Sequence, residues 1–170
     1  MILYHGTYTQ FDSIDLDKCR PFKDFGKGFY LTDLEDQAMK MAVKKSKIFN
    51  GSPVLLKFGF DEVLLTSSDL IVKQFNKPNR EWAEFIYNNR SRTRHFNHDF
   101  DIVIGPIAND GVAYLLDRYE EGTISLDQLA KELEFKELNN QFFFGTEKAI
   151  KYLNRLSAKK HKGSSWSTTL

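Results

Sequence analysis

The sequence predicts an α+β fold in which helices flank a sheet-based core. Three segments rich in branched and aromatic residues, 53–60, 101–107 and 141–146, have the character of strands. Other segments carry helix-capping signals and apolar residues at helical spacing. The 15 Phe and 7 Tyr residues suit a compact core, and 170 residues are enough to bury one without disulfide bonds.

Charge and composition exclude several classes of protein. The 24 Lys and Arg residues nearly balance the 23 Asp and Glu residues, so no overall charge attracts the chain to nucleic acid or to a membrane. No long apolar run or N-terminal signal pattern is visible, and Cys19 has no second cysteine to pair with. We expect a cytoplasmic protein with one domain over residues 1–156, a polar tail over residues 157–170 and no membrane partner.

The N-terminal segment places a histidine beside a bare backbone. Residues 2–4 predict a strand, and His5, Gly6 and Thr7 form its polar exit. An imidazole next to glycine combines a hydrogen-bonding ring with a backbone that a ligand can approach closely, which suits a small polar ligand. Residues 8–23 then predict a polar loop.

A glycine-rich turn and a short strand organise the rest of the chain. Two glycines one residue apart permit a tight turn before residues 29–32, which have strand character. Thr32 and Glu35 have the spacing of a capping box, so a helix is expected over residues 34–47. Tyr30 therefore lies late in a strand, either as an ordinary half-buried aromatic residue or as part of a site.

The same turn excludes two nucleotide-binding folds. Asp24, Phe25 and Gly26 match a protein-kinase triplet, but the strand lysine and the catalytic-loop motif of kinases are absent. Gly26, Lys27 and Gly28 do not make a dinucleotide-binding fingerprint, because no third glycine follows at the required spacing and the next element is a strand.

Further elements follow the strand at 53–60. Residues 63–66 and 70–75 predict two short extended pieces, and Asn79 precedes a helix. One face of that helix holds Trp82, Phe85, Ile86 and Asn89.

The one local basic cluster comes after this helix. Its members are Arg90, Arg92, Arg94, His95 and His98. They can contact ligand or nucleic-acid phosphates, or form an ordinary solvated charge run. His95, His98, Asp99 and Asp101 do not predict a metal site, because no cysteine lies nearby and no other pair has ligand spacing.

The C-terminal half alternates strand and helix. The strand at 101–107 precedes helices over 111–119 and 126–133, the second with a capping box at Ser125 and Gln128. After the strand at 141–146, Thr146 is expected to cap a helix that continues through Leu156.

Residues 3–7, LYHGT, and residues 27–33, KGFYLTD, resemble the two leading motifs of the ADP-ribosyltransferase superfamily, in the branch shared by diphtheria-type toxins and poly(ADP-ribose) polymerases. The resemblance is strong over about the first quarter of the chain and rests elsewhere on the order of elements. It implies a split β-sheet core with flanking helices and an NAD cleft, with NAD as co-substrate.

The resemblance also implies roles for particular residues. In that family, the histidine bonds a ribose hydroxyl of NAD and the next glycine holds the nicotinamide carboxamide, which assigns these roles to His5 and Gly6. Tyr30 would stack on the cationic nicotinamide ring, an interaction worth about 0.5 to 2 kcal/mol. Relatives often place a second aromatic residue eleven positions later. Here that position is Met41, whose thioether can contact the ring edge.

Neighbouring residues complete the expected NAD site. Arg20, Lys23 and Lys27 can reach the pyrophosphate, or can be solvated loop cations. The expected cofactor-binding set is His5, Gly6, Thr7, Arg20, Lys27, Gly28, Phe29, Tyr30, Thr32, Ala38 and Met41.

The family's third catalytic residue is a glutamate at the start of a late aromatic strand. By element order this position is Gln141, so the expected catalytic set is His5, Tyr30 and Gln141. A glutamine can orient the ribose 2′ hydroxyl, but the missing carboxylate costs several kcal/mol of stabilisation of the developing cation. Glu137 supplies that charge if the register of this strand is slipped. Alternatively, Gln141 is an ordinary polar residue at the start of a strand.

These features predict a NAD-dependent mono-ADP-ribosyltransferase that modifies a protein or nucleic-acid target and releases nicotinamide. A small enzyme of this kind resembles a bacterial toxin controlled by an antitoxin protein, and the family places target recognition in the region before the last catalytic strand. Two alternatives remain open. One is an RNA 2′-phosphotransferase-like enzyme, and the other is an NAD-binding or partner-binding module without catalysis, which Gln141 and Met41 favour.

Overall fold

Alternating apolar side chains assemble the strands into two sheets. The computed structural model describes residues 1–108, 110–133, 139–162 and 165–169, and within these ranges it has two four-stranded sheets. The first sheet has the order β1 (Ile2–Thr7), β3 (Val54–Gly59), β7 (Asn154–Lys162) and β8 (Ser165–Thr169). The second has the order β2 (Phe29–Leu31), β6 (Asn140–Phe144), β5 (Ile102–Pro106) and β4 (Val72–Gln74). The mixed α+β class is therefore confirmed.

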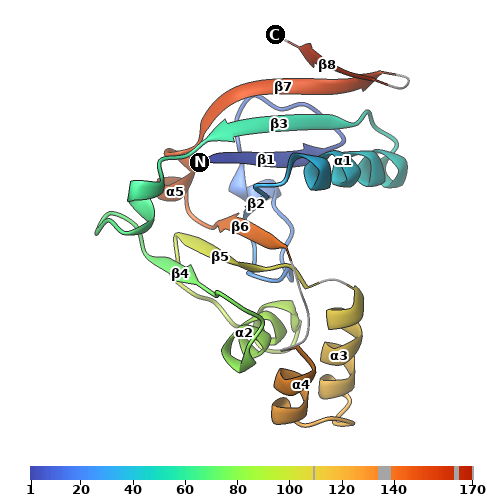
Figure 1. Cartoon of the computed structure of the whole chain (residues 1–170), viewed down its shortest axis with the longest axis vertical. Helices are drawn as coiled ribbons and strands as arrows, with labels where there is room; N and C mark the ends of the chain where they lie inside the picture. The colour runs from blue at the N-terminus through green and yellow to red at the C-terminus, as the bar shows by residue number, and fades with distance from the viewer. Residues whose placement is uncertain (109, 134–138, 163–164, 170) are drawn as a thin grey trace.

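Helices lie beside both sheets (Figure 1). They are α1 (Glu35–Phe49), α2 (Arg80–Arg90), α3 (Asp110–Glu120), α4 (Leu126–Leu133) and α5 (Glu147–Ile150), with 3₁₀ turns η1 (Leu16–Lys18) and η2 (Glu62–Leu65). Helix α1 lies along β1 and β3, whereas α2, α3 and α4 gather beside the second sheet. As expected, α3 and α4 form an insert between β5 and β6.

Two hydrophobic clusters define the layers. The first lies between the sheets and combines Leu3 and Leu56 of the first sheet with Ile102 and Phe144 of the second. The second lies between the second sheet and the helices; it includes Phe25, Trp82, Ile86, Val103, Leu129 and Phe143. Each fully buried side chain of this size contributes about 1.5 to 3 kcal/mol. Side chains of the second sheet therefore alternate between the two clusters.

Several predicted elements are confirmed. The face of α2 that holds Trp82, Phe85, Ile86 and Asn89 is buried, and the Asn79 side chain caps this helix. Ser125 and Gln128 form the predicted capping box, since the Ser125 hydroxyl accepts from the Gln128 N–H and the Gln128 side chain accepts from the Ser125 N–H.

Other predicted elements are wrong. Residues 157–170 were expected to form a polar tail, but their described part forms most of β7 and all of β8, with β7 paired to β3. The helix expected to run through Leu156 ends at Ile150, because the chain turns into β7. Residues 63–66 are not extended, because the Asp61 side chain caps a 3₁₀ turn there.

The start of α1 also differs from the prediction. The capping position is Leu34, which makes no side-chain capping bond. The Thr32 hydroxyl accepts from the Leu34 N–H, so it stabilises the entry to the helix without closing a box with Glu35.

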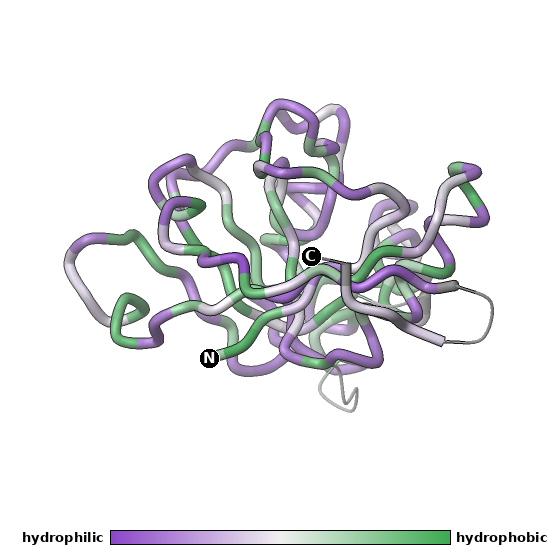
Figure 2. The backbone as a smooth tube through the Cα atoms, turned by 90° about the horizontal axis from the view of Figure 1, so that it is seen from above, coloured by the Kyte–Doolittle hydropathy of each residue, from purple (hydrophilic) through white to green (hydrophobic). Residues whose placement is uncertain are grey.

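Hydropathy varies along the whole chain, with hydrophilic stretches frequent on the outer loops (Figure 2). Among the helices of the described ranges, none combines the length and the apolar character needed to cross a bilayer.

Candidate functional site

The two sheets meet at one short bridge and then separate. Tyr4 of β1 and Thr32 exchange two backbone hydrogen bonds of 2.7 and 3.0 Å. Backbone groups alternate in direction along a strand, so Gly6, two residues after Tyr4, also directs its N–H and C=O toward β2. In the described structure, the pairing with β2 does not continue to Gly6. A backbone donor and acceptor therefore face the split between the sheets.

The His5 imidazole takes the position at which the next residue pair between β1 and β2 would form. Its Nδ1 lies 2.7 Å from the Tyr30 carbonyl oxygen, and its ring stacks on Phe29 with 4.4 Å between centroids. Burial, and then the charge of Lys45, lower the His5 pKa to about 3, so the ring is neutral. Since a carbonyl can only accept, Nδ1 carries the proton and donates, and Nε2 is left as a hydrogen-bond acceptor.

Gly6 has no room for a side chain. A Cβ at this position would lie 2.0 Å from the Ala38 carbonyl oxygen and 2.8 Å from the Ala42 nitrogen, so glycine is what allows α1 to lie directly on β1. The Gly6 carbonyl also accepts from the Lys45 ammonium group at 2.8 Å. A carbonyl oxygen has two lone pairs, which leaves capacity for a second donor.

Cations gather near this end of β1. Burial, followed by the charges of Lys23 and Arg20, lowers the pKa of Lys45 to about 8. The Arg20 guanidinium carbon lies 4.6 Å from the centroid of the Phe49 ring, at the end of α1. Lys27 instead pairs with Asp17 at 3.4 Å. Sequence reasoning selected Arg20 and Lys27 but missed Lys45, whose position two turns along α1 from Ala38 was the only available signal.

The Tyr30 phenol lies on the opposite face of β2 from the His5 ring. Its partner in β6 is Phe143, which belongs to the helix-side cluster, whereas His5 packs on Phe29 of the inter-sheet cluster. The Tyr30 hydroxyl donates to the Gly26 carbonyl at 2.8 Å and accepts from the Phe25 N–H at 3.0 Å. Burial raises its pKa. The structure thus brings His5 to the backbone of Tyr30, and the phenol fixes the glycine-rich turn.

Gln141 is buried on the same face of the second sheet as Tyr30. Its Nε2 donates to Asp24 Oδ2 at 2.7 Å and lies 3.4 Å from the Pro106 carbonyl oxygen. Both partners are acceptors, so the amide nitrogen must face them. The Gln141 carbonyl oxygen consequently points away from this pair.

Asp24 is the residue that sequence reasoning missed at this position. Its carboxylate is buried and accepts from Arg90 Nε at 2.9 Å and Nη2 at 2.7 Å, and from the Ala108 N–H at 3.1 Å. A buried carboxylate with a two-nitrogen arginine partner is a strongly held group. The structure therefore places a carboxylate beside Gln141. Glu137, the sequence alternative for that charge, lies outside the described residues.

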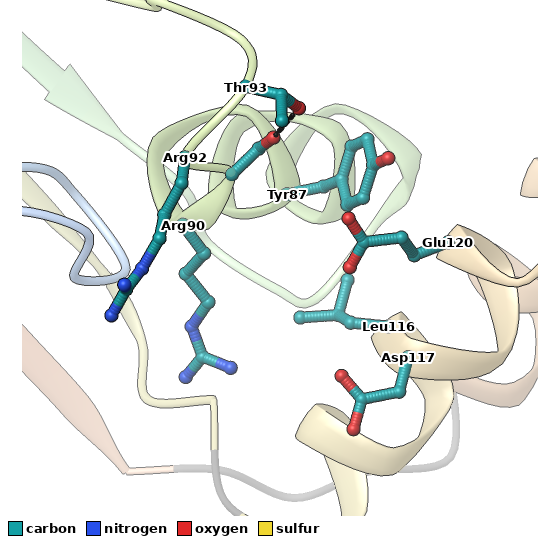
Figure 3. Close-up of a pocket in the computed structure, with 8 residues that line it drawn as sticks. Tyr87, Arg90, Arg92, Thr93, Leu116, Asp117 and Glu120 are labelled. Carbon is teal, nitrogen blue, oxygen red and sulfur yellow. Dashed lines mark hydrogen bonds between the residues drawn. The ribbon is translucent and has the colours of Figure 1, made fainter.

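Arg90 also lines a cavity of about 340 Å³ between α2 and α3. Figure 3 shows Arg90 and Arg92 on one side of it and Asp117 and Glu120 on the other. Because this cavity has charges of both signs, its walls favour neither an anion nor a cation.

The remaining predicted site residues have mainly packing roles. Thr7 is buried and pairs with Val54, and a Cβ on Gly28 would lie 2.3 Å from the Phe143 ring. Ala38 is buried against Gly6, whereas Met41 is 44% exposed on α1. No group of three His, Cys, Asp or Glu residues that could hold a metal ion occurs in the described ranges.

The family comparison matches residues 1–155, which is most of the chain. The matching family is described as "Protein of unknown function (DUF3990)". The chain belongs to this family. Nothing among curated proteins or solved structures matches it. Both strands of the split and the Asp24, Arg90 and Gln141 network lie within the matched region.

Proposed function

We propose that this protein is a NAD-dependent mono-ADP-ribosyltransferase whose nicotinamide riboside site is the split between β1 and β2. The observation that carries the proposal is the 2.7 Å contact between His5 Nδ1 and the Tyr30 carbonyl. The β1–β2 pairing ends before Gly6 at this contact, which leaves a neutral imidazole acceptor beside the Gly6 backbone.

The nicotinamide carboxamide fits this edge chemically. A primary amide offers one carbonyl acceptor and two N–H donors, which complement the N–H and C=O of Gly6. Lys45 already occupies one lone pair of the Gly6 carbonyl, so the amide N–H takes the other or displaces the lysine. A small-molecule site needs a few such fixed polar groups rather than many.

The rest of NAD finds complementary groups nearby. His5 Nε2 would accept from a ribose hydroxyl, whereas Gln141 lies on the face of the second sheet that carries the Tyr30 phenol, away from the His5 ring. Lys45, with the charges of Arg20 and Lys23 close enough to lower its pKa, provides a cationic surface for the pyrophosphate. Binding an anion there would relieve the mutual repulsion of these cations.

The proposed reaction is substitution at C1′ of the nicotinamide ribose. The acceptor nucleophile forms a bond to C1′ while the bond from C1′ to the nicotinamide nitrogen breaks. That bond's electron pair neutralises the pyridinium, so neutral nicotinamide leaves, and the proton of the nucleophile goes to water. Asp24 cannot supply uncompensated charge to the transition state, since Arg90 neutralises it. Positioning by His5 and Gly6 is therefore the main source of the rate.

Nicotinamide release from NAD tests the proposal. Wild-type protein is expected to release nicotinamide, and His5→Ala to lose about 100-fold or more of the rate because the ribose is no longer positioned. His161→Ala in β7, where the ring contacts Trp166, is the matched control and is expected to match wild type. NAD binding without release by wild type would support a binding module instead, the function that the neutral Gln141 favours.

A further inference from the structure

We propose that a second cavity, beside the glycine-rich turn, binds single-stranded nucleic acid and that this strand is the acceptor of the ADP-ribose. The cavity has a volume of about 420 Å³, within the range of about 300 to 1,000 Å³ that is usual for ligand sites. Its lining includes Phe22, Lys27, Arg92, His95, Phe96 and Phe100, and we call it the aromatic cavity. The acceptor role rests on the proposed transferase function, whereas binding does not.

The charge of the aromatic cavity has one sign. Lys27 and Arg92 line it, and none of its described lining residues is acidic. The chain as a whole has nearly equal numbers of acids and bases, so a site without acids is a local departure from the composition. It contrasts with the cavity between α2 and α3, which shares Arg92 but also contains Asp117 and Glu120. Lys27 pairs with Asp17, which does not line the cavity, and a lining with cations and no acidic residue favours a polyanion such as a phosphate backbone.

Exposed aromatic rings occur in the same place. Phe22 is 46% exposed and Phe96 is 37% exposed, although both could gain stability by burial. Phe22 has φ +59°, a left-handed conformation that is costly for a bulky side chain. The Arg92 guanidinium carbon lies 5.5 Å from the centroid of its ring. An exposed ring with an arginine beside it is the combination on which single-stranded bases stack.

The rim of the aromatic cavity is held in place. His98 Nε2 lies 2.9 Å from the Phe25 carbonyl oxygen, and His98 Nδ1 lies 3.3 Å from the Phe100 N. Since the carbonyl accepts and the N–H donates, the neutral ring donates from Nε2 and accepts at Nδ1. This ring joins the segment after α2 to the glycine-rich turn, so the aromatic cavity is preformed.

The aromatic cavity also adjoins Tyr30. Gly26 lines the cavity, and its carbonyl accepts from the Tyr30 hydroxyl. Phe143 lines it as well, and its ring lies edge-on to the Tyr30 ring with 5.3 Å between centroids. One layer of side chains thus separates the cavity from Tyr30. The cavity lies on the face of β2 that carries the Tyr30 phenol, so single-stranded nucleic acid bound at Phe22 and Phe96 would pass around β2 to reach the split where the riboside is proposed to bind.

Fluorescence anisotropy with labelled mixed-sequence oligonucleotides of about 12 nucleotides tests the binding. The key variant is Phe22→Gly combined with Arg92→Gln, because glycine removes the ring and relieves the left-handed strain at the same position. Tyr114→Ala combined with Arg118→Gln is the matched control. This pair on α3 also places an arginine over an exposed ring, at 5.9 Å, away from the aromatic cavity.

Wild type is expected to bind single-stranded DNA or RNA more tightly than duplex DNA, and the Phe22/Arg92 variant to bind at least about tenfold more weakly. The control variant should bind as wild type does. A difference in affinity between the DNA and RNA oligonucleotides shows whether the acceptor strand is DNA or RNA. Three results would overturn the inference: no single-strand binding, an equal loss in the control variant, or equally tight binding of a polyglutamate peptide.

The two proposals can fail separately. His5→Ala is expected to bind oligonucleotides like wild type, because His5 packs on the inter-sheet side of β2 and not on the aromatic cavity. Nicotinamide release without oligonucleotide binding overturns the acceptor inference alone. Oligonucleotide binding without nicotinamide release overturns the transferase proposal, whereas the inference that the aromatic cavity binds nucleic acid still holds.

Discussion

The His5 imidazole bonds the backbone carbonyl of Tyr30, at 2.7 Å, and not its phenol. This contact lies where strands β1 and β2 stop pairing, one residue beyond the Tyr4 and Thr32 bridge. A side chain here replaces a backbone partner, so the end of the β1–β2 pairing and the orientation of the imidazole have the same cause.

The neutral His5 ring makes stability depend on pH. Its pKa is about 3 in the folded protein and 6.5 as an ordinary side chain, so the unfolded state binds the proton more tightly. The His5 contribution is complete above pH 6.5 and is lost as pH falls toward 3, with a slope of at most about 1.4 kcal/mol per pH unit. Urea unfolding between pH 7 and 5 should show a flatter pH dependence for His5→Gln than for wild type. Parallel curves would contradict this account of His5.

Gly6→Ala should destabilise the protein strongly. The added Cβ would lie 2.0 Å from the Ala38 carbonyl oxygen. Because the atoms it meets belong to the backbone of α1, no side chain can move aside to remove the clash. Overpacking of this kind costs about 1 to 3 kcal/mol or more. Gly59→Ala in β3 is the control, because its Cβ would lie 3.5 Å from the Leu156 side chain, an ordinary contact. Thermal unfolding of both variants measures the difference, and equal melting temperatures would show that α1 does not press on β1.

Gln141→Glu should not increase the stability or the activity of the protein, although the resemblance to ADP-ribosyltransferases implies a glutamate at this position. The new carboxylate would face Asp24 Oδ2, which now lies 2.7 Å from the Gln141 amide nitrogen, and two like charges at that distance repel. We expect a lower melting temperature at pH 7 than at pH 5, because protonation of one carboxyl relieves the repulsion. Faster nicotinamide release by Gln141→Glu than by wild type would contradict the structural position of Gln141.

Asp24 and Arg90 should be strongly coupled. Removing one partner from a buried ion pair costs about 3 to 5 kcal/mol, whereas removing both leaves no unpaired charge. Because Arg90 is 31% exposed at its side chain, the lower end of that range applies. A double-mutant cycle with Asp24→Asn and Arg90→Met, measured by urea unfolding, should give a coupling energy of about 1 to 3 kcal/mol. Additive effects would mean that the pair contributes no specific interaction.

Local patterns were sufficient to predict the elements that depend on local forces. The buried face of α2 and the Ser125 capping box follow from spacing alone. Strands β7 and β8 were missed because their residues are mostly polar. They join the first sheet because β7 pairs with β3, about a hundred positions earlier, and β8 pairs with β7. A strand with so few apolar residues has no clear period in the sequence.

The candidate site shows the same limit. Sequence reasoning selected His5, Tyr30 and Gln141, but it could not show that the His5 ring and the Tyr30 phenol lie on opposite faces of β2. Asp24 was missed because its partners Arg90 and Gln141 lie 66 and 117 positions away. Contacts between such distant positions are set by the fold and not by local spacing.

A crystal structure with a non-hydrolysable NAD analogue tests the central claim most directly. We expect the carboxamide on the Gly6 backbone and a ribose hydroxyl within about 2.6 to 3.2 Å of His5 Nε2. An analogue bound away from the split, with His5 Nε2 making no contact to it, would contradict the account.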